Sequence, residues 1–180
     1  MRGRGMIAGF ASGARCVADR LAGVAIPSVV LESFQEEPID LRQLAQQRPL
    51  VLYLYPGSDR SPADGEQTPL MDQAQHRAFV DRRADLAARS YQAVGVSSQS
   101  VKAQLRSALA GQLTQRLFSD PELQLARALE LPTFDLDEAR WYHRLTLIAK
   151  DGRVEKAFFP VARAGRSAAQ VITWMQVQGI

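Results

Sequence analysis

Cysteine is almost absent from this sequence, whose 180 residues contain one, Cys16. A single cysteine excludes a disulfide within the chain and agrees with a reducing compartment, so we expect a cytoplasmic protein. Histidine is nearly as scarce, with His76 and His143 alone. Neither has a cysteine or a second histidine at the spacing that zinc sites use. We therefore expect no metal and no cofactor.

Long apolar runs and concentrated charge are lacking as well. No stretch approaches the roughly 20 apolar residues of a membrane-spanning helix, so we expect no membrane partner. The net charge is only +3, and the arginines are scattered along the chain rather than grouped among aromatic residues. This pattern argues against nucleic-acid binding.

Residues 1–22 are the least regular part of the chain. Two arginines precede a short apolar stretch that Gly9 and Gly13 interrupt, which is a poor match to a signal peptide. We expect 1–22 to be a partly ordered leader. Residues 23–180 contain no repeat and no low-complexity linker, so we expect them to form one domain.

The most informative stretch is residues 50–71. Residues 50–55 are apolar or aromatic and uncharged, which predicts a strand buried on both faces. Pro56 and Gly57 end that strand, a polar loop follows, and Thr68-Pro69 is typical of a helix start. In α/β proteins, ligands bind where such loops leave the carboxyl ends of parallel strands.

The remaining patterns predict alternating strands and helices. We expect a first hairpin of residues 26–32 and 39–41, and later strands at 91–97, 116–120, 144–149 and 153–161. We expect helices at 14–22, 41–47 (capped by Asp40), 68–89, 101–113, 122–129 (opened by Pro121) and 167–178 (capped by Ser167). Residues 132–142 are expected to be a loop with a short extended piece. This order predicts an α/β fold: a mixed central sheet with helices on both faces and an N-terminal β-hairpin.

Four motifs, in this order and at this spacing, add a family resemblance that covers residues 25–178. They are Tyr53-Leu54-Tyr55-Pro56, Gly95-Val96-Ser97-Ser98-Gln99, Leu117-Phe118-Ser119-Asp120 and the segment 144–152. The chain resembles the peroxiredoxins (the AhpC/TSA family), and among them the bacterioferritin-comigratory type. The resemblance implies a thioredoxin-like fold, thiol-dependent peroxide reduction as the family activity, and a homodimer.

The resemblance also implies a set of site residues. Pro56 matches the proline that opens the family motif, and Arg144 matches an arginine of the late strand. Ser61 matches a hydroxyl residue that helps hold the peroxide. The nucleophilic cysteine itself is missing, and its position falls on Asp64 in one register or on Gln67 in another. Neither residue can form a sulfenic acid.

Two readings stay open for the polar residues of this region. Asp64, Glu66 and Gln67 either bind a cationic ligand or metal, or complement the dipole of the following helix. Arg144 either retains an anion site facing the loop or forms a salt bridge to Asp64 or Glu66.

Other chemistry-bearing residues give weaker signals. Cys16 is a candidate relocated nucleophile, because Arg15 and Arg20 would lower its pKa at a helix end. His76, between polar neighbours, is expected to be solvated. A hydrolase built from Ser97 or Ser98 with His143 lacks the Gly-x-Ser-x-Gly elbow. A final group of aromatic residues is expected in the core or at a dimer contact: Trp141, Tyr142, Phe158, Phe159 and Trp174.

These observations lead to one main hypothesis. The chain is a degenerate peroxiredoxin-like protein that binds a protein partner or a small anionic ligand near residues 57–69 and Arg144. The alternative is an active thiol peroxidase or redox protein that uses Cys16.

Overall fold

A computed structural model describes residues 16–57, 67–136 and 138–180, with the backbone alone for 67–71. The strands are β1 (Val30–Leu31), β2 (Ile39–Asp40), β3 (Leu50–Leu54), β4 (Gln92–Ser97), β5 (Arg116–Ser119), β6 (Thr133–Leu136), β7 (Ala139–Tyr142), β8 (Leu145–Lys150) and β9 (Arg153–Phe158). The helices are α2 (Leu41–Gln47), α3 (Gln67–Asp81), α4 (Arg83–Ala87), α5 (Val101–Gly111), α6 (Gln124–Leu129) and α7 (Ser167–Val177), with a 3-10 turn η2 (Ala164–Arg166). A further helix covers residues 16–21.

A five-stranded mixed sheet forms the centre of the molecule, in the order β5-β4-β3-β8-β9. The pairs β3–β4 and β4–β5 are parallel, whereas β8 is antiparallel to both β3 and β9. Every residue of β3 is buried, as the uncharged run 50–55 predicts. The predicted mixed sheet is therefore confirmed.

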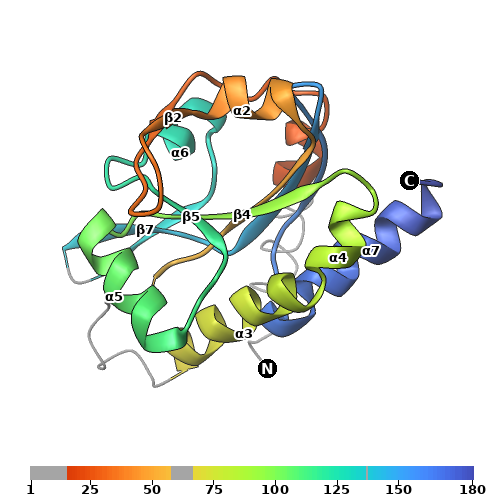
Figure 1. Ribbon diagram of the computed structural model, residues 1–180. Helices are drawn as coiled ribbons and strands as arrows, with labels where there is room; N and C mark the ends of the chain where they lie inside the picture. The colour runs from red at the N-terminus through yellow and green to blue at the C-terminus, as the bar shows by residue number, and fades with distance from the viewer. Residues whose placement is uncertain (1–15, 58–66, 137) are drawn as a thin grey trace, which may run out of the picture.

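Helices cover both faces of this sheet (Figure 1). One face carries α2, α6 and the helix 16–21, and its core includes Leu21, Leu44 and Leu125. The other face carries α3, α4, α5 and α7, and its core includes Phe79 and Val171. No helix in the described part of the chain has the length and hydropathy needed to cross a membrane.

Two hairpins lie where the sequence predicts them. β1 and β2 pair as the expected antiparallel hairpin, and the Asp40 carboxylate accepts a hydrogen bond from the amide of Gln43 at the start of α2. Between β8 and β9, Asp151 and Gly152 both have positive φ, at 52° and 73°. An Asp-Gly pair suits such a hairpin because both residues tolerate the left-handed region.

Several expected boundaries are wrong. The expected helix 68–89 is two helices, since α3 ends at Asp81 and α4 begins after Arg82, whose φ of −102° and ψ of 10° are not helical. The segment 132–142 is not a loop but a hairpin of β6 and β7. The first strand is shortened to β1, because only Val30 and Leu31 form a ladder with β2.

The expected starts of two later helices are also corrected. α6 begins at Gln124 rather than after Pro121, because Leu123 has a φ of 50°. The Asp120 carboxylate reaches across this turn and accepts hydrogen bonds from the amides of Gln124 and Leu125. Ser167 does not cap α7 but is its first residue, and its hydroxyl donates to the carbonyl of Ala164.

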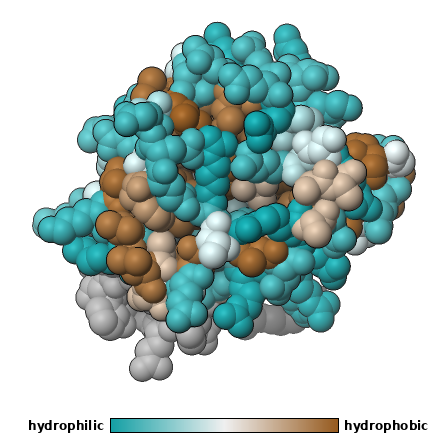
Figure 2. Space-filling model, viewed as in Figure 1, coloured by the Kyte–Doolittle hydropathy of each residue, from teal (hydrophilic) through white to brown (hydrophobic). Residues whose placement is uncertain are grey.

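α5 exposes the leucines that its apolar pattern places on one side. Leu105 and Leu109 are 38% and 70% exposed, whereas Ala103, Gln104 and Ala108 face the sheet. Figure 2 shows apolar surface on the side of the molecule where α5 lies. Among the expected aromatic group, Tyr142 is fully buried and the others are partly exposed.

Candidate functional site

The candidate site lies where β3 ends and α3 begins. Leu54 of β3 pairs with Leu145 of β8, so the residues that follow β3 lie beside the residues that precede β8. Pro56 and Arg144 accordingly line the same small cavity, of about 230 Å³. Two of the residues that the family resemblance assigns to the site are thus brought together.

Gly57 is required at the point where the chain leaves the sheet. Its φ is +104°, and a Cβ at this position would approach the Cγ of Gln99 to 2.4 Å. Any side chain would therefore be both strained and in collision. The next residues, including Ser61, Asp64 and Glu66, lie outside the described part of the chain. Gln67 is the first residue of α3, and its side chain is likewise outside the description.

Arg144 is almost buried and forms an ion pair with Asp72. One guanidinium nitrogen lies 2.5 Å from the Asp72 carboxylate, and the two side chains are 11% and 3% exposed. A second nitrogen donates to the Oε1 of Gln75 at 2.8 Å. Arg144 thus forms a salt bridge within the described part of the chain. The carboxylate of this pair belongs to Asp72, in the second turn of α3. The expected partners Asp64 and Glu66 lie outside the described part of the chain, so a pair with either of them stays a prediction.

The expected solvent exposure of His76 is wrong. It is 3% exposed rather than solvated, and its Nδ1 lies 2.9 Å from the hydroxyl of Tyr53. Burial, together with the charge of Arg144, lowers the pKa of His76 to about 3. Burial also raises the pKa of Tyr53 far above its usual value. Tyr53 therefore stays protonated, and its hydroxyl forms a hydrogen bond with a neutral imidazole.

The reason for this error is the orientation of α3. The repeat of Leu70, Ala74 and Ala78 suggests an apolar face, but Ala74 is exposed. The face that packs on the sheet instead carries Asp72, Gln75, His76 and Phe79. These positions have the i, i+3, i+4, i+7 spacing of one helical face. That spacing is the signal by which the buried polar residues could have been found.

A cavity of about 490 Å³ lies between α3 and α5, beside this cluster. Asp72 and His76 line it from α3, and Arg106 and Ser107 line it from α5. Tyr55 completes the wall, with its ring centroid 4.6 Å from that of His76. The cavity thus combines aromatic rings with a carboxylate, a guanidinium and a hydroxyl, which suits a small polar ligand.

A second buried network holds the ends of β4 and β5. The Nε2 of Gln104 donates to the carbonyl of Phe118 at 2.6 Å and to the hydroxyls of Ser97 and Tyr55 at 3.0 and 3.3 Å. Ser97 in turn donates to the Oε1 of Gln99. Ser97 is therefore a structural residue.

The other chemistry-bearing side chains lie apart from this cluster. The ring of His143 packs against Phe134 and Phe159, and burial lowers its pKa. Cys16 is exposed and lies on the helix 16–21, whose Leu21 belongs to the core on the face opposite α3. In the described part of the chain, no three His, Cys, Asp or Glu side chains gather closely enough to hold a metal ion.

The mixed sheet, the helix after β3 and the arginine before β8 define a thioredoxin-like fold of the peroxiredoxin type. Solved structures agree with this class. The peroxidoxin BcpB of Mycobacterium tuberculosis aligns with a TM-score of 0.69 at 19% identity, over 87% of this chain and 96% of that one. Prx3 of Vibrio vulnificus in complex with H2O2 aligns with a TM-score of 0.72 at 16% identity, over 88% and 97%. A mutant of Xylella fastidiosa PrxQ aligns with a TM-score of 0.72 at 19% identity, over 88% and 97%.

The sequence itself carries the family assignment. A model of the AhpC/TSA family matches residues 22–157, and the chain belongs to this family. A search of curated proteins returned no match. The fold and family expected from the four motifs are therefore confirmed.

Proposed function

We propose that this protein is an AhpC/TSA family member without thiol peroxidase activity, which binds a small anionic ligand beside the start of α3. One observation carries the first part of the proposal. The only cysteine in the 180 residues, Cys16, is exposed and lies on a helix that packs against the opposite face of the sheet from α3. The sheet thus separates the Cys16 thiol from Arg144, which contacts Asp72 and Gln75 of α3. A peroxidatic thiolate of this family would act beside that arginine and the start of α3.

The ion pair of Arg144 supports the same conclusion. In a thiol peroxidase of this family, an arginine would stabilise the thiolate and the developing negative charge. Here the Asp72 carboxylate is 2.5 Å from the Arg144 guanidinium, and Gln75 accepts a further hydrogen bond. The positive charge of Arg144 is thus balanced by a carboxylate of the chain itself.

The cavity between α3 and α5 supports the second part of the proposal. Arg106 is an exposed cation on its wall, and Ser107 supplies a hydroxyl. A small ligand with a carboxylate or phosphate group would reach both while its remaining atoms contact the ring of Tyr55. Tyr55 and Asp72, on the wall of this cavity, flank in the chain the segment 57–69, where the sequence analysis places a ligand or a protein partner.

Peroxide consumption tests the loss of activity. The full chain and Cys16→Ser are incubated with H2O2 or an organic hydroperoxide and excess dithiothreitol, beside a cysteine-containing peroxiredoxin as positive control. We expect both forms to match the rate without protein. Turnover that survives Cys16→Ser would refute the proposal. Turnover that Cys16→Ser abolishes would favour the alternative, and mass spectrometry would then find an added oxygen or an intermolecular disulfide at Cys16.

Ligand binding is tested separately, by NMR titration of the labelled chain with a panel of small carboxylates and phosphates. The expected result is a set of shifted amides in α3 and α5 that Arg106→Gln weakens. Lys102→Gln removes the same charge from the same helix and is the control, since Lys102 does not line the cavity. Shifts that are equal in both variants would show that only the overall charge matters.

A further inference from the structure

A third cavity, of about 590 Å³, lies at the opposite end of the sheet, where β4 and β5 begin. It opens between the end of α2 and the helix α4. Among the described residues, its lining combines three arginines (Arg48, Arg83 and Arg116), neutral polar groups and an apolar wall, and contains no carboxylate. Neither the proposed function nor the site residues described above involve this cavity.

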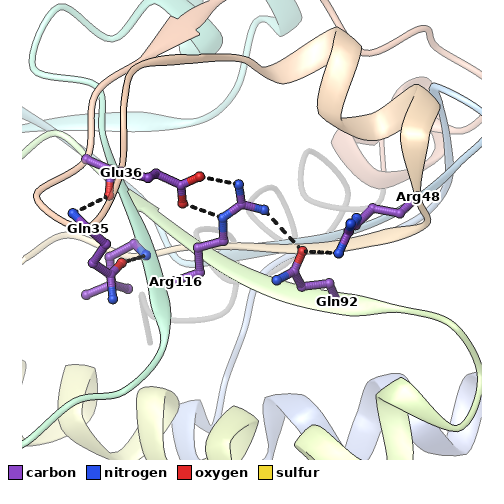
Figure 3. Close-up of polar contacts among 7 residues, drawn as sticks. Gln35, Glu36, Arg48, Gln92 and Arg116 are labelled. Carbon is purple, nitrogen blue, oxygen red and sulfur yellow. Dashed lines mark hydrogen bonds and ion pairs between the residues drawn. The ribbon is translucent and has the colours of Figure 1, made fainter.

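Arg116 is held in place by a carboxylate from outside the lining. Its Nε and one terminal nitrogen each lie 2.5 Å from an oxygen of Glu36. The other terminal nitrogen donates to the Oε1 of Gln92 at 3.1 Å. Figure 3 shows this guanidinium between Glu36 and Gln92, with Arg48 approaching the same amide oxygen from the other side. The bidentate pair fixes the plane of Arg116 at the cavity.

Arg48 and Arg83 contact neutral acceptors in the described part of the chain. Arg48 reaches Gln92 at 3.5 Å, which is a weak contact. One terminal nitrogen of Arg83 lies within 3.1 Å of the carbonyl and hydroxyl oxygens of Thr114 and the Oε1 of Gln115. No described carboxylate forms an ion pair with either side chain. Of the three guanidinium groups at the cavity, that of Arg116 alone forms an ion pair with a described carboxylate, that of Glu36.

The apolar part of the wall lies on the α4 side. Leu86 is 1% exposed and Tyr91 is 4% exposed, so their packing is fixed by the core. The hydroxyl of Tyr91 donates to Glu155 and is therefore already engaged. Ala87 and Ala93 complete this apolar part of the wall. This surface suits the hydrophobic part of a ligand rather than its charged group.

We propose that this cavity binds a small organic anion, with its phosphate or carboxylate group among Arg48, Arg83 and Arg116. The apolar or aromatic body of the ligand lies against Leu86 and Ala87. Like charges that converge on one cavity repel each other, and a bound anion relieves that repulsion. Arginine is also the side chain whose planar donors match carboxylate and phosphate oxygens.

Isothermal titration of the full chain at low ionic strength tests the proposal, with phenyl phosphate and benzoate as probes. Phenol tests the apolar body alone, and inorganic phosphate tests the charge alone. We expect one of the two aromatic anions to bind at least tenfold more tightly than phenol or inorganic phosphate. The tighter of the two identifies the anionic group. If neither binds at millimolar concentration, the proposal is wrong.

Substitutions that each remove one arginine charge test where the anion binds. Arg83→Gln and Arg48→Gln are each expected to weaken binding about tenfold, as for the loss of one hydrogen bond to a charged group. Arg163→Gln is the control because Arg163 is exposed and does not line the cavity. Arg48 is exposed and makes only the weak contact to Gln92, so its replacement leaves the fold intact, which circular dichroism checks. Equal weakening in Arg163→Gln, or none in Arg48→Gln and Arg83→Gln, would overturn the assignment.

Discussion

The ion pair of Asp72 and Arg144 makes the most direct prediction about stability. In Asp72→Asn the side chain keeps its size, and its charge is lost. The Arg144 guanidinium, whose side chain is 11% exposed, then lacks the Asp72 charge in a place that water scarcely reaches. Removing one partner of a buried pair typically costs 3–5 kcal/mol. Because Gln75 still accepts a hydrogen bond from Arg144, we expect Asp72→Asn to lower the free energy of unfolding by about 3 kcal/mol, at the lower end of this range.

An exposed pair in the same region provides the matched control. Arg82 and Asp85 lie 3.0 Å apart, with side chains that are 51% and 45% exposed. Solvent screens such a pair, so Asp85→Asn is expected to cost less than about 1 kcal/mol. Both variants lose one carboxylate, which keeps the change in net charge the same.

Urea unfolding measures both costs, from the midpoint and slope of each transition. A double-mutant cycle with Arg144→Gln isolates the interaction itself, and we expect a coupling free energy of about 2 kcal/mol. The double variant should therefore be more stable than the sum of the single losses. If Asp72→Asn costs no more than Asp85→Asn, or if the coupling is below about 0.5 kcal/mol, Arg144 is not balanced by Asp72 as described.

The unfolded chain protonates His76 near pH 6.5 and the folded chain only near pH 3, so unfolding free energy should fall by about 2–3 kcal/mol from pH 7 to pH 4.5 through this residue. His76→Gln should remove that part of the slope, and His143→Gln should remove less; equal slopes in all forms would contradict it. Asp120→Ala removes the carboxylate that accepts from the first amides of α6 and from the Tyr142 hydroxyl. Thermal and urea unfolding should therefore show a loss of about 3 kcal/mol in the free energy of unfolding, against about 1 kcal/mol for Tyr142→Phe. The homodimer implied by the family resemblance remains a prediction: sedimentation should give twice the mass of one chain, and Leu109→Glu, on the exposed side of α5, should raise the monomer fraction if α5 forms the contact.

Much of the fold could be predicted from local patterns. The uncharged run 50–54 and the alternation around Asp151-Gly152 each identify a strand or turn without reference to distant residues. The Asp40 cap is likewise a local interaction, between residues three positions apart. Errors arose where two local signals compete. Pro121 is a common first residue of a helix, but the left-handed Leu123 delays α6 until Gln124.

The sequence by itself determined the family, the sheet and the absence of a cysteine at the nucleophile position, because these depend on residue identity and order. Only the tertiary structure decided which carboxylate faces Arg144, since Asp72 is distant in the chain and the orientation of α3 brings it there. The same holds for the arginine-lined cavity, whose Arg48, Arg83 and Arg116 come from separate elements that meet at one end of the sheet. Periodicity identifies a helical face, but the packing of that face against the sheet decides whether its polar residues are buried.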